Sequence, residues 1–224
     1  MQQLEPPTHL RRRFELASTQ VMIGSRQYDL LRPRNIDDLI SEEEFNLDER
    51  IPYWADCWPS SRILAERLHG ERGQGRRLLE LGCGIGLVSL AAAAAGFQVL
   101  ATDYYADALE FTAANLSRYG LETADTRLVD WRKLPSDLGT FDVVAASDVL
   151  YERPQAALIA EVFASTLSVH GLGLLSDPGR RTAQGFIDEC GRRGLHAKCV
   201  DRVPTTDAKA SLTISIFEIR RGSS

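Results

Sequence analysis

A glycine-rich segment, Glu80-Leu81-Gly82-Cys83-Gly84-Ile85-Gly86, follows a short apolar run and has the residue types of a ligand-binding turn. Closely spaced glycines let the backbone turn sharply and approach a ligand closely. Asp103 stands 17 residues after Gly86, at the end of the next apolar run. A carboxylate in that place can accept two hydrogen bonds from a ribose diol, so the spacing predicts an adenosine-containing cofactor. The candidate cofactor contacts in this region are Glu80, Gly82, Cys83, Gly84, Gly86, Asp103 and Tyr104.

The order of the glycines favours one cofactor over another. The dinucleotide fingerprint G-x-G-x-x-G needs a third glycine where this chain has Leu87 or Ser89, depending on the starting glycine. The pattern acid-x-G-x-G-x-G, led here by Glu80, is instead associated with S-adenosylmethionine. Carboxylates at Glu80 and Asp103 suit a sulfonium cofactor that carries an amino group. NAD(P) and a glycine turn without a ligand remain the alternatives.

Two further pairs of residues follow later apolar runs and extend the same candidate site. Asp130-Trp131 offers a ring that can stack on adenine and a carboxylate for its amino group. Ser147-Asp148-Val149-Leu150-Tyr151 places an acid and a phenol three residues apart, close enough to frame one small reacting group. The simpler interpretations are a rim tryptophan at Trp131 and a helix-capping aspartate at Asp148.

The elements that must position these residues alternate along the chain. Apolar runs predict strands at 77–81, 98–102, 125–129, 141–146 and 172–175, and helical spacing predicts helices at 60–68, 87–95, 106–119, 154–167 and 182–193. Such alternation is typical of a parallel sheet covered on both faces. Two final strands, 196–203 and 211–219, are joined by a link too short for a parallel crossover. We therefore expect an α/β, Rossmann-like, doubly wound sheet of seven strands with one antiparallel strand.

The first fifty residues differ in character from the rest. Residues 14–23 and 27–31 flank Gly24-Ser25, which predicts a β-hairpin. An acidic stretch follows and is interpreted as a solvated linker. It contains Asp37, Asp38, Glu42, Glu43, Glu44, Asp48 and Glu49. We expect an N-terminal extension at 1–50 and the main domain at 51–224.

Composition excludes several classes of protein. The net charge is −5, which disfavours a phosphate-backbone partner, and the N/D-P-P-Y/F segment typical of nucleic-acid amine methylation is absent. The four cysteines form no C-x-x-C pair, so a zinc site or a disulfide framework is not expected. The most apolar run is too short for the ~20 residues that span a bilayer, and the first residues do not resemble a secretory signal. We expect a cytoplasmic protein with no metal, nucleic-acid or membrane partner.

With these motifs in place, the chain resembles the seven-β-strand S-adenosylmethionine-dependent methyltransferases. More narrowly, it resembles the protein lysine methyltransferases defined by a D-x-x-Y motif, here Asp148-Val149-Leu150-Tyr151. The segment 52–59 matches the family's P-Y-W-A-x-x-W-P, and residues 177–180 match a D-P-G-R signature. These outer segments are similar to the branch that methylates the electron-transfer flavoprotein β-subunit. The resemblance covers roughly residues 50–220.

The resemblance implies roles for individual residues. Gly82, Cys83 and Gly84 would line the methionine part of the cofactor. The other implied cofactor contacts are Asp103 at the ribose, Trp131 at the adenine, Ser147 through its backbone, and Trp58 near the methionine end. Asp148 and Tyr151 would shape the access route of a substrate amine.

The implied activity is methyl transfer to a lysine of a protein substrate, with S-adenosylmethionine as cofactor. A lysine is mostly protonated at pH 7, because its unperturbed pKa is about 10.4. Our hypothesis is that Asp148 orients the amine and helps to accept its proton, while Tyr151 supplies an aromatic wall and a hydroxyl. The alternatives are a small-molecule N- or O-methyltransferase and an NAD(P)-binding or non-catalytic module.

Overall fold

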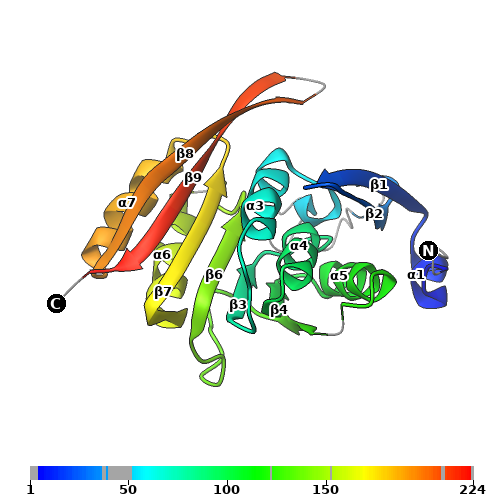
Figure 1. The fold of residues 1–224 in the computed structure, drawn as a ribbon, viewed down its shortest axis with the longest axis horizontal. Coiled ribbons are helices and arrows are strands. Elements are labelled where there is room, and N and C mark those ends of the chain that lie inside the picture. The colour runs from blue at the N-terminus through cyan, green and yellow to red at the C-terminus, as the bar shows by residue number, and fades with distance from the viewer. Residues whose placement is uncertain are drawn as a thin grey trace.

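The fold is a seven-stranded sheet with helices on both faces and a small hairpin beside it (Figure 1). The computed structural model describes residues 5–36, 39, 52–121, 123–151, 153–207 and 210–222. The helices are α1 (Thr8–Arg13), the 3-10 turn η2 (Tyr53–Ala55), α3 (Pro59–His69), α4 (Leu87–Ala94), α5 (Ala106–Arg118), α6 (Arg153–Thr166) and α7 (Thr182–Arg192). The strands are β1 (Leu16–Ile23), β2 (Arg26–Pro33), β3 (Arg77–Leu81), β4 (Gln98–Asp103), β5 (Ala124–Leu128), β6 (Phe141–Ser147), β7 (Leu167–Asp177), β8 (Leu195–Asp207) and β9 (Ala210–Arg221).

The main sheet has the topology that the sequence predicts. Within the described residues its strand order is β5-β4-β3-β6-β7-β9-β8. The five strands from β3 to β7 are all parallel, whereas β9 runs antiparallel to both of its neighbours, β7 and β8. The prediction of seven strands with one antiparallel strand is therefore confirmed. The carboxyl ends of β3, β4 and β6 consequently meet at one edge of the sheet.

Alternate residues of the central strands point to opposite faces, so the sheet carries two cores. Leu78 of β3 packs on one side with α3, α4 and α5, whereas Leu79 packs on the other side with α6 and α7. Figure 1 shows these two helical layers in front of the sheet and behind it. In the part of the chain that is described, no helix combines the length and the apolar character needed to cross a bilayer.

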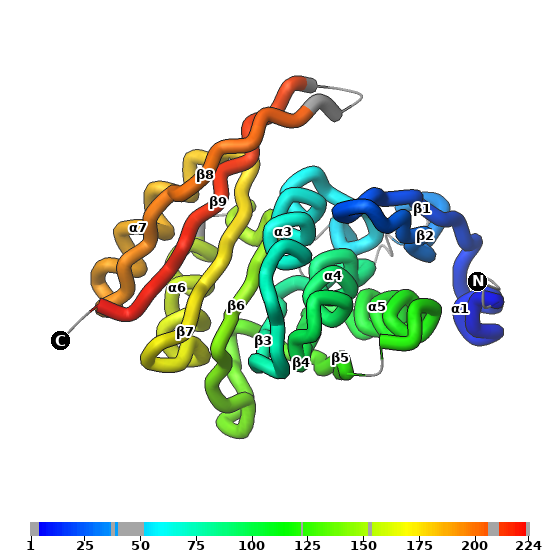
Figure 2. The backbone as a smooth tube through the Cα atoms, in the orientation of Figure 1, coloured from blue at the N-terminus to red at the C-terminus, as the bar shows by residue number. Residues whose placement is uncertain are grey.

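The predicted N-terminal hairpin forms and docks on α5. The side chain of Asn115 holds it, because Oδ1 accepts a hydrogen bond from Leu31 N at 2.7 Å and Nδ2 donates to Leu31 O at 2.9 Å. Nδ2 also donates to the carbonyl of Ile85, in the glycine turn, at 2.8 Å. Figure 2 shows α1 and the hairpin at one end of the molecule, with α7, β8 and β9 at the other. The acidic stretch expected at 37–49 lies almost wholly outside the described residues.

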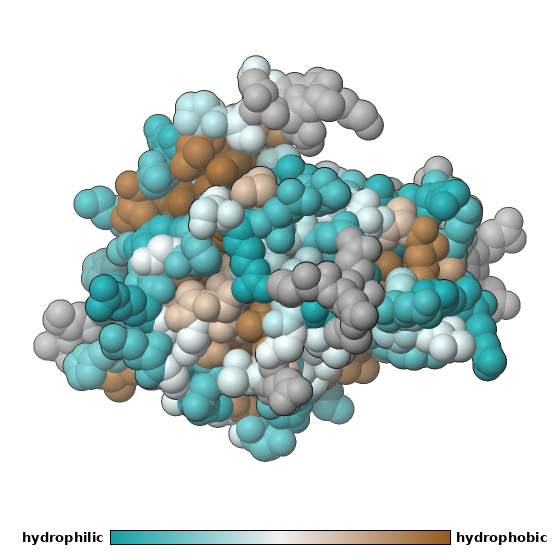
Figure 3. Space-filling view, turned by 45° about the vertical axis from the view of Figure 1, so that its right-hand side comes forward, coloured by the Kyte–Doolittle hydropathy of each residue, from teal (hydrophilic) through white to brown (hydrophobic). Residues whose placement is uncertain are grey.

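The sequence prediction differs from the structure in the length of several elements. Helix α1 was not expected, and β7 begins at Leu167 rather than at residue 172. Strand β8 continues through Pro204, where a loop is predicted. Among the described residues it pairs with β9 alone, and an edge strand tolerates a proline because its missing N–H faces no neighbouring strand. Figure 3 shows apolar surface on the upper part of the molecule, where Figure 1 places this hairpin, and Val200 of β8 is exposed.

Candidate active site

The turn between β3 and α4 presents backbone rather than side chains. Gly82, Gly84 and Gly86 all have positive φ angles, of 71°, 54° and 87°. A Cβ on Gly84 would lie 2.9 Å from the carbonyl oxygen of Trp54, so glycine is required there by space as well as by conformation. The amides of Gly82 and Cys83 both donate to Thr102 O at 2.9 Å, which ties the turn to the end of β4.

Asp103 lies against this turn, as the spacing predicts. Its Oδ2 accepts a hydrogen bond from Gly84 N at 2.9 Å, and its Oδ1 accepts one from Tyr105 N at 3.0 Å. Burial raises the pKa of this carboxyl, while the backbone donors act in the opposite direction. Each carboxylate oxygen has a second lone pair, so the group can still accept hydrogen bonds from a diol.

Glu80 and Cys83 are both buried at the turn. Glu80 is 1% exposed and accepts a hydrogen bond from Ser89 Oγ on α4. Burial raises the pKa of Glu80 to about 8. The thiol of Cys83 accepts a hydrogen bond from Thr112 Oγ1 at 3.4 Å, and burial raises its pKa well above the usual value. Both side chains therefore link the turn to the helices that pack on it, Glu80 to α4 and Cys83 to α5.

Trp131 lies beside Gly82, because two atoms of its indole ring would be 3.4 Å from a Cβ at that position. Its Nε1 is buried and has no hydrogen-bond partner within the described residues. Its neighbour Asp130 is engaged by Arg132, whose guanidinium donates to both carboxylate oxygens at 2.9–3.1 Å. Arg132 also lies over the ring of Tyr104, 5.2 Å from its centroid. Tyr104 and Asp130 are thus joined by a residue that the sequence reasoning did not select.

Asp148 follows the carboxyl end of β6 in a left-handed backbone conformation, with φ of 61°. Its amide donates to Ser176 O at 2.9 Å, and the preceding Ser147 pairs with Ser176 in the sheet. The carboxylate is 9% exposed and receives a hydrogen bond from the guanidinium of Arg180. Because α6 begins only at Arg153, Asp148 is not the residue that caps it.

Three aromatic rings lie in a row that ends at Tyr151, three residues after Asp148 in the chain. The ring of Tyr53 is centred 6.1 Å from that of Tyr151 and 5.8 Å from that of Trp58. Trp58 Nε1 donates to Tyr53 O at 2.8 Å, which fixes the chain between them. Tyr53 and Tyr151 are 43% and 39% exposed. Tyr53 was missed at the sequence level, although it stands inside the P-Y-W-A-x-x-W-P segment.

These observations fit an adenosine cofactor at the carboxyl ends of β3, β4 and β6. The turn consists largely of glycine backbone, Asp103 offers acceptors, and the indole N–H of Trp131, which has no hydrogen-bond partner among the described residues, offers a buried donor. The remaining predicted contacts group around this core. Trp58 belongs to the aromatic row, Tyr104 and Asp130 meet through Arg132, and Ser147 ends β6.

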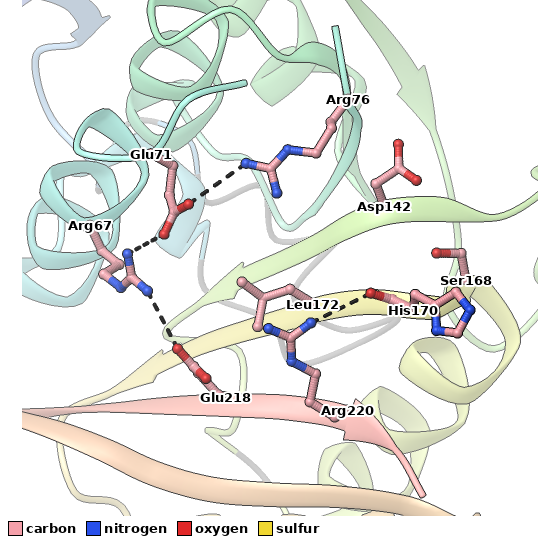
Figure 4. A pocket seen from close by; sticks show the side chains of 9 residues that line it. All are labelled: Arg67, Glu71, Arg76, Asp142, Ser168, His170, Leu172, Glu218 and Arg220. Atoms are coloured by element: carbon pink, nitrogen blue, oxygen red, sulfur yellow. Dashed lines mark hydrogen bonds and ion pairs between the residues drawn. The ribbon is translucent and has the colours of Figure 1, made fainter. Parts of the chain in front are cut away.

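A separate cavity of about 300 Å³ lies at the amino ends of the strands, away from the turn (Figure 4). It is lined by Arg67, Glu71, Arg76, Asp142, Ser168, His170, Leu172, Glu218 and Arg220. Arg67 bridges Glu71 and Glu218, and Arg76 lies 3.6 Å from Glu71. Four of the lining charges therefore pair with one another across the cavity, which lies at the opposite edge of the sheet from the turn.

Comparison with known proteins agrees with this geometry. The family model "Methyltransferase domain" matches residues 78–169. The chain is 34% identical over 149 residues to the electron transfer flavoprotein beta subunit lysine methyltransferase of Danio rerio. This alignment covers 65% of this chain and 56% of the relative. It is 27% identical over 175 residues to the ribosomal protein L11 methyltransferase of Pseudomonas aeruginosa, covering 75% of this chain and 54% of the relative. The chain thus spans about half the length of the curated relatives it matches.

Solved structures share the fold. A TehB-like SAM-dependent methyltransferase from Corynebacterium glutamicum superposes with a TM-score of 0.54 at 14% identity, covering 80% of this chain and 97% of that chain. Residues 78–169 of the chain therefore match a methyltransferase domain, and the chain is similar to curated protein lysine methyltransferases.

Proposed function

We propose that this protein is an S-adenosylmethionine-dependent protein lysine N-methyltransferase. One observation carries the proposal: the loop after β6 carries Asp148 and Tyr151, its Val149 lies against Gly82 of the turn, and the exposed ring of Tyr151 neighbours that of Tyr53. A carboxylate attracts an ammonium group, and aromatic faces attract the same cation. Such a surface suits the end of a lysine side chain.

The cofactor would be held by the residues already described. The backbone of the turn at Gly82 and Gly84 would accommodate its methionine part, Asp103 would accept hydrogen bonds from the ribose, and Trp131 would contact the adenine. When bound, the cofactor supplies a methyl group on a positively charged sulfur. The protein then mainly positions the reactants and excludes water.

Two residues would act on the substrate amine. Asp148 would hold the arriving ammonium and help to take its proton, so that the nitrogen lone pair becomes free. Tyr151 would form one wall of the access route and could hydrogen bond to the nitrogen. Replacing Asp148 with alanine should therefore strongly lower the rate of transfer while leaving the affinity for S-adenosylhomocysteine within about threefold.

The finer proposal concerns the substrate. The relative from Danio rerio is a lysine methyltransferase for the electron transfer flavoprotein beta subunit, which supports that subunit as the first substrate to test. Ribosomal protein L11 is the second, because of the relative from Pseudomonas aeruginosa.

The experiment incubates the purified protein with methyl-labelled cofactor and each candidate substrate, and then with a cell extract. Mass spectrometry assigns any label to a residue, and a Lys→Arg substitution in the substrate provides the matched control. Label on lysine supports the proposal. Label only in small molecules would favour a small-molecule methyltransferase, and binding of NAD without S-adenosylhomocysteine would remove the methyltransferase assignment.

A further inference from the structure

The end of β7 and the loop after it contain Asp177-Pro178-Gly179-Arg180, a segment that the proposed function leaves without a role. Asp177 is fully buried, and its Oδ1 accepts hydrogen bonds from Gly179 N at 2.8 Å and from Arg180 N at 2.7 Å. Its Oδ2 lies 3.6 Å from the guanidinium of Arg180. Asp177 therefore fixes both the backbone and the side chain of the arginine.

The guanidinium of Arg180 reaches from this loop to the loop after β6, where it donates to Asp148 Oδ1. Two further hydrogen bonds hold the loops together. Thr182 Oγ1 donates to the carbonyl of Leu150, and Asp148 N donates to Ser176 O. The contact between Arg180 and Asp148 thus lies between two segments that these two hydrogen bonds already hold together.

Asp148 needs such a partner for two physical reasons. Its backbone lies in the left-handed region, which is unfavourable for a residue other than glycine and persists only where neighbours hold it. Its side chain is also mostly removed from water, so an unpaired charge there would be costly. Arg180 supplies the opposite charge at one oxygen of the carboxylate.

We propose that Arg180 is a positioning residue for the methylation reaction: it holds the carboxylate of Asp148 by one oxygen and leaves the other for the substrate amine, while Asp177 holds Arg180. This inference rests on the proposed function, because it assigns Asp148 to the amine. It gives the D-P-G-R segment a task at the same site.

The formal charges explain why an arginine suits this task. Asp148, Asp177 and Arg180 together carry one net negative charge, which matches one arriving ammonium group. Without Arg180 the site would carry two negative charges and would hold the ammonium more firmly in its protonated, unreactive form. Removal of Arg180 should therefore lower kcat without raising KM.

The test is a double-mutant cycle with Arg180→Met, Asp148→Asn and the combination, assayed for kcat and KM on a lysine-containing protein substrate. Arg180→Met should lower kcat on the order of 100-fold, since small misplacements of reacting groups have effects of that size. KM and the affinity for S-adenosylhomocysteine should stay within about threefold. Because Arg180 acts through Asp148, the combination should be no slower than Asp148→Asn alone.

Two more variants separate positioning from loop support. Arg180→Lys should recover part of the lost kcat, because an ammonium can still reach a carboxylate. Arg181→Met, at the exposed next residue, should leave kcat unchanged. Multiplicative losses in the combined variant, or an equal loss in Arg181→Met, would overturn the inference.

Failure of the proposed function is visible separately, as a wild-type protein that methylates no lysine. In that case the unfolding temperatures of the wild type, the two single variants of the cycle and the combined variant test the contact between Arg180 and Asp148. A smaller loss in the combined variant than the sum of the single losses supports the contact between Arg180 and Asp148. Additive losses would contradict it.

Discussion

Replacing the buried Glu80 with glutamine should stabilise the protein, and more so as the pH rises. Burial is the main cause that raises the pKa of Glu80 from 4.5 to about 8, and the nearby Asp103 carboxylate acts in the same direction. In the unfolded chain the carboxyl loses its proton near pH 4.5. The folded protein keeps that proton up to about pH 8, so folding becomes less favourable as the pH rises between these two values.

The size of the effect follows from the two pKa values. One pKa unit corresponds to about 1.4 kcal/mol, so the full cost is roughly 5 kcal/mol above pH 8 and vanishes below pH 4.5. Between pH 6 and pH 9 the contribution changes by about 3 kcal/mol. Glutamine has a similar shape and does not titrate, so the Glu80→Gln protein lacks this term and can still hydrogen bond to Ser89.

Urea unfolding of the wild type and of Glu80→Gln at pH 6, 7.5 and 9, without cofactor, measures this difference directly. The stability gap between the two proteins should widen with pH by about 3 kcal/mol. Glu15→Gln is the matched control, because Glu15 is mostly exposed, and its gap should not change with pH. A constant gap for Glu80→Gln over the whole range would refute the reasoning.

Three further predictions concern the turn, the hairpin and the aromatic row. Gly84→Ala should weaken S-adenosylhomocysteine binding, measured by calorimetry, at least about tenfold, because the new Cβ would meet the Trp54 carbonyl. Gly120→Ala is the control: Gly120 has a similar positive φ but faces open space, so its replacement should not affect binding. Asn115→Ala should lower the free energy of unfolding, measured by urea titration, by about 3 kcal/mol, because it leaves three buried backbone groups unpaired. A loss below about 1 kcal/mol would contradict this prediction. Tyr53→Leu should raise KM for a protein substrate about fivefold, because the aromatic ring attracts the ammonium group. Tyr53→Phe keeps the ring and should not raise KM, so equal KM values for the two variants would contradict the prediction.

Much of the fold could be predicted because each central strand is a short apolar run. Leu78 and Leu79 face different helical layers, so both positions are apolar and the strand is unmistakable. The length of β8 could not be predicted in this way. A proline normally ends a strand, and β8 continues through Pro204 because it lies at the edge of the sheet.

Part of the candidate site could likewise be predicted from the sequence, and part could not. The glycine turn and Asp103 were accessible from sequence because both stand at ends of predicted strands, and parallel strand ends meet at one edge. The contact between Asp148 and Arg180 joins residues 32 positions apart on two loops, and no local pattern encodes it. The burial of Glu80 likewise depends on how α4 packs on β3, which spacing alone does not specify.

Asn115 joins the hairpin and the glycine turn through one amide group, with consequences for how the two respond to a ligand. Energetic coupling between two sites is reciprocal. A ligand that reduces the motion of the turn at Ile85 therefore also reduces local opening at Leu31, on the far side of the asparagine. Slower hydrogen–deuterium exchange of the Leu31 amide on addition of S-adenosylhomocysteine would report this shared rigidity.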